Sequence, residues 1–463
     1  MFKLNTMVKK TVALIGAAAV LLMTPLQAYA AISSTGSVVS SVDTSDYTWP
    51  TAPDVSAGSC ILIDADTGSI LYEKNAYEKC YPASTTKILT GLLTIENCSM
   101  SEIVTFSKEA AESVNVTEDA NLGTKEGEQY TVEQALYGML LYSANEIAYG
   151  LAEHVAGSLD AFVEMMNEKA AEVGALNTHF ANASGLYDEN HYTTAYDMAM
   201  IARACYNNAT FVSIDSTYTS YTIPATNKTS TARTFKHRHQ MLYGRTYYYE
   251  YCKGGKTGFT SESQYTLVTF AEKDGMRLIC VTFEEPSDES RYVDTKALFE
   301  WGFDNFTKTT TSNSNISSLL TNDTIYASDV FTTKALNYNL TASFITIPDS
   351  GSSSDVTVAL DDNYDITNDN GALTVHLKYL YGDNIVGTTT LTISSKNSET
   401  NSLLPYLSET SNSSEYTAKK CLRINIWILL GAIIVLLIIA YLIQILRTDN
   451  RRKRRHGKRK LRF

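Results

Sequence analysis

Two residues of the stretch YPASTTKILTGLLTIE (residues 81–96) can carry out nucleophilic chemistry together. Ser84 and Lys87 stand three residues apart at the start of an apolar run. If this run is helical, their side chains lie about one turn apart on one face and can meet. A lysine drawn against apolar neighbours loses proton affinity, and a neutral amine can accept the proton of a nearby hydroxyl. Taken alone, so short a pattern is also what an exposed lysine on an ordinary core helix would show.

Two later stretches add further candidates. In LLYSANEIAYG, Ser143 and Asn145 follow an apolar helix and are expected at its end or in the next turn. In KGGKTGFTSE, Lys256 and Thr257 enter a β-rich run together with Gly258. Gly258 has no side chain, so a ligand could approach that strand closely.

The surrounding elements form a pattern of strands, then helices, then strands. A hairpin is expected around Asp66-Thr67-Gly68, and a capping box at Thr131 and Gln134 opens a helical region that continues to Gly174. Strands return on both sides of the turn at residues 273–275, and a closing helix is expected over residues 290–306. A sheet built from N- and C-terminal strands with a helical insert beside it predicts an α/β or α+β domain of about 250 residues.

The ends of the chain predict export and a membrane anchor. Lys3, Lys9 and Lys10 precede an apolar stretch and a small-x-small cleavage site at residues 28–30, as in a signal peptide; an uncleaved anchor is the alternative. Residues 424–446 are almost wholly apolar and are followed by ten basic residues, which predicts a transmembrane helix with its C-terminus in the cytoplasm.

The predicted organisation places one catalytic region between these ends. Its parts are a signal peptide (1–30), a linker (31–54), the main domain (55–306), a polar linker (307–318), a small all-β domain (319–394), a stalk (395–423), the transmembrane helix (424–446) and a basic tail (447–463). Alternation of polar and apolar residues around turn signals is the basis for the all-β domain.

The net charge and the cysteine spacing argue against nucleic-acid binding and against a zinc site. The formal net charge is −12, and subtracting +9 for the tail and +3 for the first ten residues leaves −24 for residues 11–446. We expect no nucleic-acid binding from such an ectodomain. The seven cysteines show no zinc-like spacing, His237-x-His239 is expected in a solvated loop, and residues 243–252 are expected to be a half-buried strand. We therefore expect no metal and no cofactor.

In order, Ser-x-x-Lys, Ser-x-Asn and Lys-Thr-Gly are the motifs of penicillin-binding proteins and serine β-lactamases. Together with FANASGLYDENHYTTAYDMA and DADTGSILYEKN, they make residues 55–306 resemble the D-alanyl-D-alanine carboxypeptidase family of low-molecular-mass penicillin-binding proteins. The resemblance implies a β-lactamase/transpeptidase-like fold. It also implies peptidoglycan stem peptides as substrates, β-lactams as covalent inhibitors, and catalysis outside the bacterial cell membrane.

The resemblance also assigns roles. Ser84 would be the nucleophile, Lys87 its base and Ser143 a proton relay between Lys87 and the leaving amine. Asn145 would hold the substrate amide, Lys256 would add positive charge that helps to keep Lys87 neutral, and Thr257 and Thr260 would bind the terminal carboxylate. The backbone N–H groups of Ser84 and Phe259 would form the oxyanion hole. Some relatives carry histidine at the position of Phe259, so only its backbone role is carried over.

Three alternatives remain open at the level of the sequence. The same fold also serves D,D-endopeptidases and β-lactamases, and a β-lactam or peptide sensor would share the binding site. The Ser-Ala-Asn motif and the absence of a convincing deacylating glutamate motif argue against a class A β-lactamase. The short basic tail holds no signalling domain, which argues against a sensor.

Overall fold

The computed structural model describes residues 47–115, 117–311, 336–340, 344–361, 367–369 and 372–395. The chain divides into two units, residues 1–405 and 406–463, and every described residue belongs to the first. The expected signal peptide, transmembrane helix and basic tail lie outside the described residues. Within the described part, none of the helices combines the length and the apolar character that a membrane span requires.

The main sheet joins the two ends of the predicted domain. It has five antiparallel strands in the order β2-β1-β9-β8-β7. These are β1 (Ser59–Asp64), β2 (Ile70–Lys74), β7 (Cys252–Thr260), β8 (Gln264–Lys273) and β9 (Met276–Glu285). Because β1 pairs with β9, the expectation of a sheet made from N- and C-terminal strands is confirmed.

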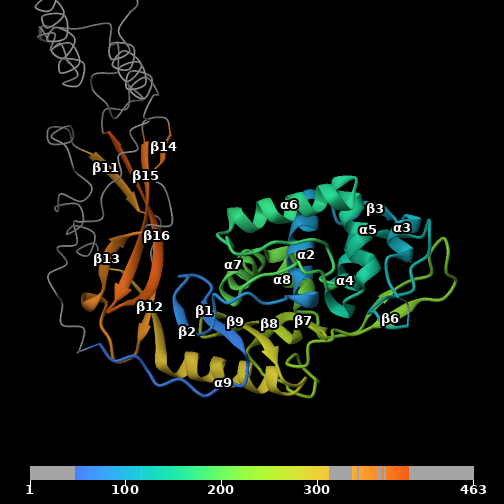
Figure 1. The fold of residues 1–463 in the computed structure, drawn as a ribbon. Coiled ribbons are helices and arrows are strands. Elements are labelled where there is room, and N and C mark those ends of the chain that lie inside the picture. Colours follow the sequence, from blue (N-terminus) through green and yellow to red (C-terminus); the bar gives the residue numbers. More distant parts are fainter. Residues whose placement is uncertain are drawn as a thin grey trace, which may run out of the picture. The chain divides into compact units, whose positions relative to one another are not determined.

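The helices lie on both faces of this sheet (Figure 1). One face carries the helical insert, and the other carries α9 (Ser290–Asn305). The insert contains η2 (Ala83–Thr86), α2 (Lys87–Asn97), α3 (Lys108–Glu112), α4 (Val132–Tyr142), α5 (Asn145–Ala156), α6 (Leu159–Glu172), α7 (Ala195–Tyr206) and α8 (Ala209–Asp215). It also holds two short antiparallel strand pairs, β3 (Ile103–Thr105) with β4 (Gln129–Thr131), and β5 (Tyr221–Ile223) with β6 (Arg233–Phe235).

The four central residues of strand β1, CILI, are all apolar because both faces of the strand are covered. Successive side chains of a strand point to opposite faces of a sheet. Ile61 and Ile63 join the core beneath the helical insert, whereas Cys60 and Leu62 join the core beneath α9. Both faces are covered, so the strand has no solvent-facing position along this run, and the thiols of Cys60 and Cys280 are buried.

A second β-rich region follows α9. Strand β10 (Phe306–Thr310) pairs with β12 (Phe344–Pro348), and a further sheet has the order β11-β16-β15-β13, with β14 also on β15. Its strands are β11 (Leu336–Leu340), β13 (Thr357–Leu360), β14 (Thr367–Asp369), β15 (Ala372–Tyr381) and β16 (Asn384–Ser395), and η3 (Ser353–Asp355) precedes β13. An all-β character was expected here, although the limits of the domain stay a prediction.

Three local expectations were wrong. The linker predicted from residue 307 begins with β10, because a threonine-rich run suits a strand once β12 is there to pair with it. Residues 243–251 form turns instead of a strand; their tyrosines pack by stacking, as Tyr247 does on Tyr292 with ring centroids 4.9 Å apart. His237 and His239 are buried rather than solvated.

Candidate active site

Ser84 and Lys87 meet at the junction of η2 and α2. Lys87 Nζ lies 2.9 Å from Ser84 Oγ, 2.6 Å from Asn145 Oδ1 and 2.5 Å from the carbonyl oxygen of Ser184. The Lys87 side chain is fully buried, while Ser84 is half-buried. Ala83 precedes the serine with a φ of +49°, a left-handed conformation that alanine seldom adopts and that shapes the turn into the helix.

The surroundings of Lys87 favour a neutral amine. Its pKa is lowered to about 7, first by burial and then by the positive charge of Arg238. The carboxylates of Glu146 and Asp119 act in the opposite direction. Burial also lowers the pKa of Lys256 well below its usual value, and repulsion from Lys87 adds to that effect. Lys87 thus opposes protonation of Lys256, whereas the cation that lowers the pKa of Lys87 is Arg238 and not the expected Lys256.

Ser143 stands on the other side of the site. Helix α4 begins with the predicted capping box of Thr131 and Gln134, and it ends at Ser143 with a φ of +69°. That turn presents Ser143 Oγ to Lys256 Nζ at 2.9 Å. Among the described residues, no hydrogen bond joins Ser143 to Lys87, which the expected relay would need. Asn145 begins α5 and instead binds Lys87 through Oδ1.

Strand β7 forms one wall and approaches the nucleophile closely. A Cβ atom on Gly258 would lie 2.3 Å from Thr266 Oγ1 and 2.9 Å from the backbone nitrogen of Ser84. The sequence had suggested close approach of a ligand here, and the structure shows close approach of the nucleophile's own backbone. Thr257, Phe259 and Thr260 continue this wall, and Thr260 Oγ1 lies 3.0 Å from Ser263 Oγ in the β7–β8 turn.

All the predicted site residues except the two buried lysines line one cleft of about 620 Å³, namely Ser84, Ser143, Asn145, Thr257, Gly258, Phe259 and Thr260. Sequence reasoning missed several other lining side chains, among them Glu118, Asp119, Arg238, Tyr247, Asp288 and Arg291. Arg291 Nη1 donates to the carbonyl oxygens of Gly258 at 3.0 Å and Thr266 at 3.2 Å, which fixes a cation behind β7.

Arg238 reaches the cleft because its segment is extended. From Phe235 to His239, buried and exposed residues alternate, so the two histidines turn inward and Arg238 turns outward. His239 Nε2 lies 2.9 Å from Thr269 Oγ1 on β8, and His237 Nε2 lies 3.4 Å from Asp215 Oδ1. This alternation is visible in the sequence FKHRH and could have indicated the orientation of the arginine.

His191 is buried. Its Nε2 lies 2.8 Å from Thr86 Oγ1, and its Nδ1 accepts a hydrogen bond from the backbone nitrogen of Ala181 at 3.0 Å. His191 thereby links the backbone at Ala181, shortly before Ser184, to the turn that carries Ser84. It does not line the cleft.

Solved structures share this fold. A D-alanyl-D-alanine carboxypeptidase from Mycobacterium tuberculosis is 30% identical with a TM-score of 0.50, over 55% of this chain and 94% of that one. Penicillin binding protein 6B from Escherichia coli is 25% identical with a TM-score of 0.55, over 73% and 96%. The likeness supports the expected transpeptidase-like α/β fold of the main domain.

Sequence comparison agrees with the structural comparison. The Bacillus subtilis D-alanyl-D-alanine carboxypeptidase DacF is 34% identical over 259 residues, 54% of this chain and 63% of the relative. The Escherichia coli D-alanyl-D-alanine carboxypeptidase DacC is 31% identical over 262 residues, 54% and 62%. The matches thus cover less than two thirds of these relatives. The family model for D-alanyl-D-alanine carboxypeptidase matches residues 46–287, more than half of the sequence, and the chain belongs to that family.

Proposed function

We propose that this protein is a serine-type D-alanyl-D-alanine carboxypeptidase that removes the terminal D-alanine of peptidoglycan stem peptides through an acyl-enzyme on Ser84. The observation that carries the proposal is the set of partners around Lys87 Nζ. Asn145 Oδ1 and the Ser184 carbonyl oxygen can only accept hydrogen bonds, so they take two N–H groups of the amine. In the neutral amine, the lone pair is left for the hydroxyl of Ser84.

Acylation follows from this geometry. Ser84 transfers its proton to Lys87 as Oγ attacks the carbonyl carbon of the penultimate D-alanine. The oxyanion forms near the backbone nitrogens of Ser84 and Phe259, which the close approach of β7 at Gly258 brings together. The C–N bond then breaks, and the departing D-alanine amine takes up the proton held by Lys87 by way of Ser143, whose hydroxyl must turn from Lys256 Nζ toward Lys87 for this step. Water finally hydrolyses the ester.

Positive charge near β7 suits a substrate that ends in a free carboxylate. The guanidinium groups of Arg291, behind the strand, and of Arg238, in the cleft, carry this charge, while the buried Lys256 faces Ser143. Thr257 and Thr260 provide hydroxyl groups on the same wall. This distribution of charge supports release of a terminal residue, and a β-lactam, which carries a carboxylate next to its reactive carbonyl, fits the same arrangement.

Penicillin labelling tests the mechanism. One equivalent should attach to the Ser84 peptide, and Ser84→Ala should abolish labelling. Lys87→Arg should slow acylation by about 10² or more, because a guanidinium stays charged and cannot accept the serine proton. The matched control is Lys253→Arg on the same strand as Lys256, where the lysine side chain is 41% exposed. Labelling of Ser84→Ala, or a rate in Lys87→Arg equal to that of the control, would refute this mechanism.

Turnover on two substrates separates the carboxypeptidase from its alternatives. A pentapeptide stem should release D-alanine faster than a cross-linked dimer is cut. A faster cut of the dimer would favour an endopeptidase, and rapid hydrolysis of penicillin would favour a β-lactamase.

We also propose that the protein acts on the outer side of a bacterial cell membrane, held by residues 424–446. The sequence of the two ends supports this location. Protease added to intact spheroplasts should remove the catalytic domain, while the basic tail stays protected. Digestion only after lysis would contradict the location without affecting the proposed reaction.

A further inference from the structure

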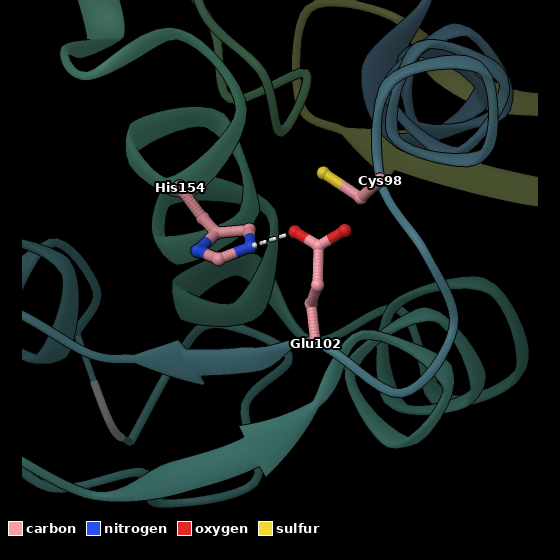
Figure 2. Close-up of side chains that lie close together, drawn as sticks. All are labelled: Cys98, Glu102 and His154. Carbon is pink, nitrogen blue, oxygen red and sulfur yellow. Dashed lines mark ion pairs between the residues drawn. The ribbon is translucent and has the colours of Figure 1, made fainter.

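Three side chains that can ligate a metal gather away from the cleft. Cys98 lies just after α2, Glu102 just before β3 and His154 in the last turn of α5. Their potential ligand atoms, one from each residue, all lie within 4.8 Å of one another. Figure 2 shows the thiol and the imidazole on either side of the carboxylate. In the described part of the chain, no other group of three such residues comes this close.

The carboxylate is already held in place by the backbone. The amide of Ser99 donates to Glu102 Oε1 at 2.6 Å, and the amide of Glu102 donates back to the Ser99 carbonyl oxygen at 3.0 Å. This closed turn puts Cys98 and Glu102 on the same side. The next residues form β3, which pairs with β4, so the turn is anchored at its far end as well. Ligands held in this way need little rearrangement to bind an ion.

The imidazole faces the second carboxylate oxygen. His154 Nε2 lies 3.4 Å from Glu102 Oε2, and their side chains are 23% and 46% exposed. Ligands of a tetrahedral zinc ion stand about 3.3 to 3.8 Å apart, given metal–ligand bonds of roughly 2.0 to 2.3 Å. The nitrogen–oxygen pair is therefore already at zinc spacing, and only the sulfur must move closer. The partial exposure leaves a path for the ion to enter.

The donor set selects the kind of ion. A thiolate and an imidazole are poor ligands for Mg²⁺ or Ca²⁺, which prefer oxygen, whereas sulfur, nitrogen and carboxylate oxygen together suit Zn²⁺. We propose that Cys98, Glu102 and His154 bind one Zn²⁺ ion, with water as the fourth ligand, and that the ion joins the C-terminal ends of α2 and α5. On binding, the thiol of Cys98 releases its proton to solvent and sulfur forms the bond to zinc.

The position of this site gives it a structural role. Helix α2 starts at Lys87 and α5 starts at Asn145, so the N-terminal ends of the same two helices form the catalytic contact. The helices run 11 and 12 residues. At 1.5 Å per residue, their far ends lie about 15 Å from the cleft. A metal there would hold the two helices together without touching a substrate.

Cobalt substitution in the purified full-length protein tests the proposal. One equivalent of Co²⁺ should produce a thiolate-to-metal absorption band, and Zn²⁺ should displace it. Cys98→Ser should abolish the band, and His154→Gln should weaken binding by about tenfold or more. The matched controls are Cys252→Ser, a half-buried thiol outside the cluster, and His179→Gln, an exposed histidine outside it. Both should bind as the unaltered protein does.

Thermal unfolding supplies a second readout that needs no enzymatic activity. Excess Zn²⁺ should raise the midpoint of the unaltered protein and of both controls, but not that of Cys98→Ser. Absence of the thiolate band, or equal binding by Cys98→Ser and the unaltered protein, would overturn the site. A band that disappears in Cys252→Ser would instead assign the metal elsewhere and overturn it equally.

Discussion

Lys87 and Arg238 show how individual residues divide the work of the site. Lys87 is buried among two carbonyl-type acceptors and one hydroxyl, so its useful form is the neutral amine. Arg238 is exposed, and its guanidinium carbon lies 4.4 Å from the centre of the Tyr142 ring. From there its charge opposes protonation of the buried lysine. The reactive residue and the residue that tunes it are far apart in the sequence.

The pH dependence of acylation should report the pKa of Lys87. We expect the rate of penicillin acylation to rise with pH through a midpoint near 7, since only the neutral amine accepts the serine proton. Arg238→Ala removes a positive charge, so the lysine pKa should rise and the midpoint should move to higher pH. Arg238→Lys keeps the charge and should keep the midpoint. A midpoint that stays in place in Arg238→Ala would contradict this coupling, whatever happens to the plateau rate.

Glu285 should make stability depend on pH. This carboxyl group on β9 is fully buried. Its pKa is raised from 4.5 to about 7, mainly by burial and in addition by the negative charge of Asp294. Between pH 4.5 and pH 7, the folded state therefore binds a proton that the unfolded state has lost. The free energy of unfolding should fall as the pH rises through this range. Glu285→Gln should remove this fall and gain up to about 3 kcal/mol at pH 8. Denaturant unfolding at pH 4 and pH 8 measures it, with exposed Glu284→Gln as the control.

At the scale of elements, the catalytic groups sit where helices and strands begin or end. Ser84 lies in the turn before α2, Ser143 just after α4, and Asn145 at the first residue of α5. Lys256 lies within β7, facing the Ser143 turn. Packing of the helical insert on the sheet is what brings these ends to one place. The distance between β7 and η2 then decides whether the oxyanion site is formed.

Gly258→Ala tests that distance. The added methyl group would meet Thr266 Oγ1 and the Ser84 amide, so β7 must move away from the nucleophile. We expect a loss of about 1 to 3 kcal/mol in stability from overpacking and at least about tenfold slower acylation. Gly275→Asn is the control, because the glycine at that turn has no atom within 4 Å of its added Cβ and asparagine tolerates its φ of +82°. Normal acylation by a folded Gly258→Ala would show that the spacing is not critical.

On the scale of the whole molecule, the first hairpin meets the second β-rich region through polar contacts, of which the one between Thr346 and Asp64 is buried. Thr346 Oγ1 donates to Asp64 Oδ2 at 2.9 Å, and the amide of Thr388 donates to the Thr67 carbonyl oxygen at 3.0 Å. Lys308 Nζ lies 2.7 Å from Asp66 Oδ2. None of these residues lines the cleft. The contacts therefore support the hairpin rather than the chemistry.

Removal of the second β-rich region should spare catalysis. A chain of residues 46–311 keeps every residue of the cleft and the buried Phe306, but it loses the partner of Asp64. We expect it to be labelled by penicillin at Ser84 and to unfold at a lower temperature than the longer chain, because a buried carboxylate loses a hydrogen bond. Circular dichroism establishes whether the shortened chain is folded. A folded chain that is not labelled would show that the β-rich region contributes to the site.

The local structure of the site and the family of the protein could both be predicted from the sequence. Local rules were sufficient for the hairpin at Asp66, the capping box at Thr131 and the contact of Ser84 with Lys87, because each depends on residues within one turn of a helix or one tight turn of the chain. The order of the three motifs was sufficient to predict the family, and the match of the family model to residues 46–287 confirms that prediction.

The long-range features could not be predicted from the sequence, because they depend on how distant segments pack. The strand at β10 depends on a partner more than thirty residues away, and the burial of His237 and His239 depends on β8 and α8 packing over a segment that reads as basic and polar. The same holds for Arg238 as the charge beside Lys87 and for the meeting of Cys98, Glu102 and His154. Such contacts join segments whose own sequences carry no sign of one another, so the side chains become neighbours only once the helices and the sheet have packed.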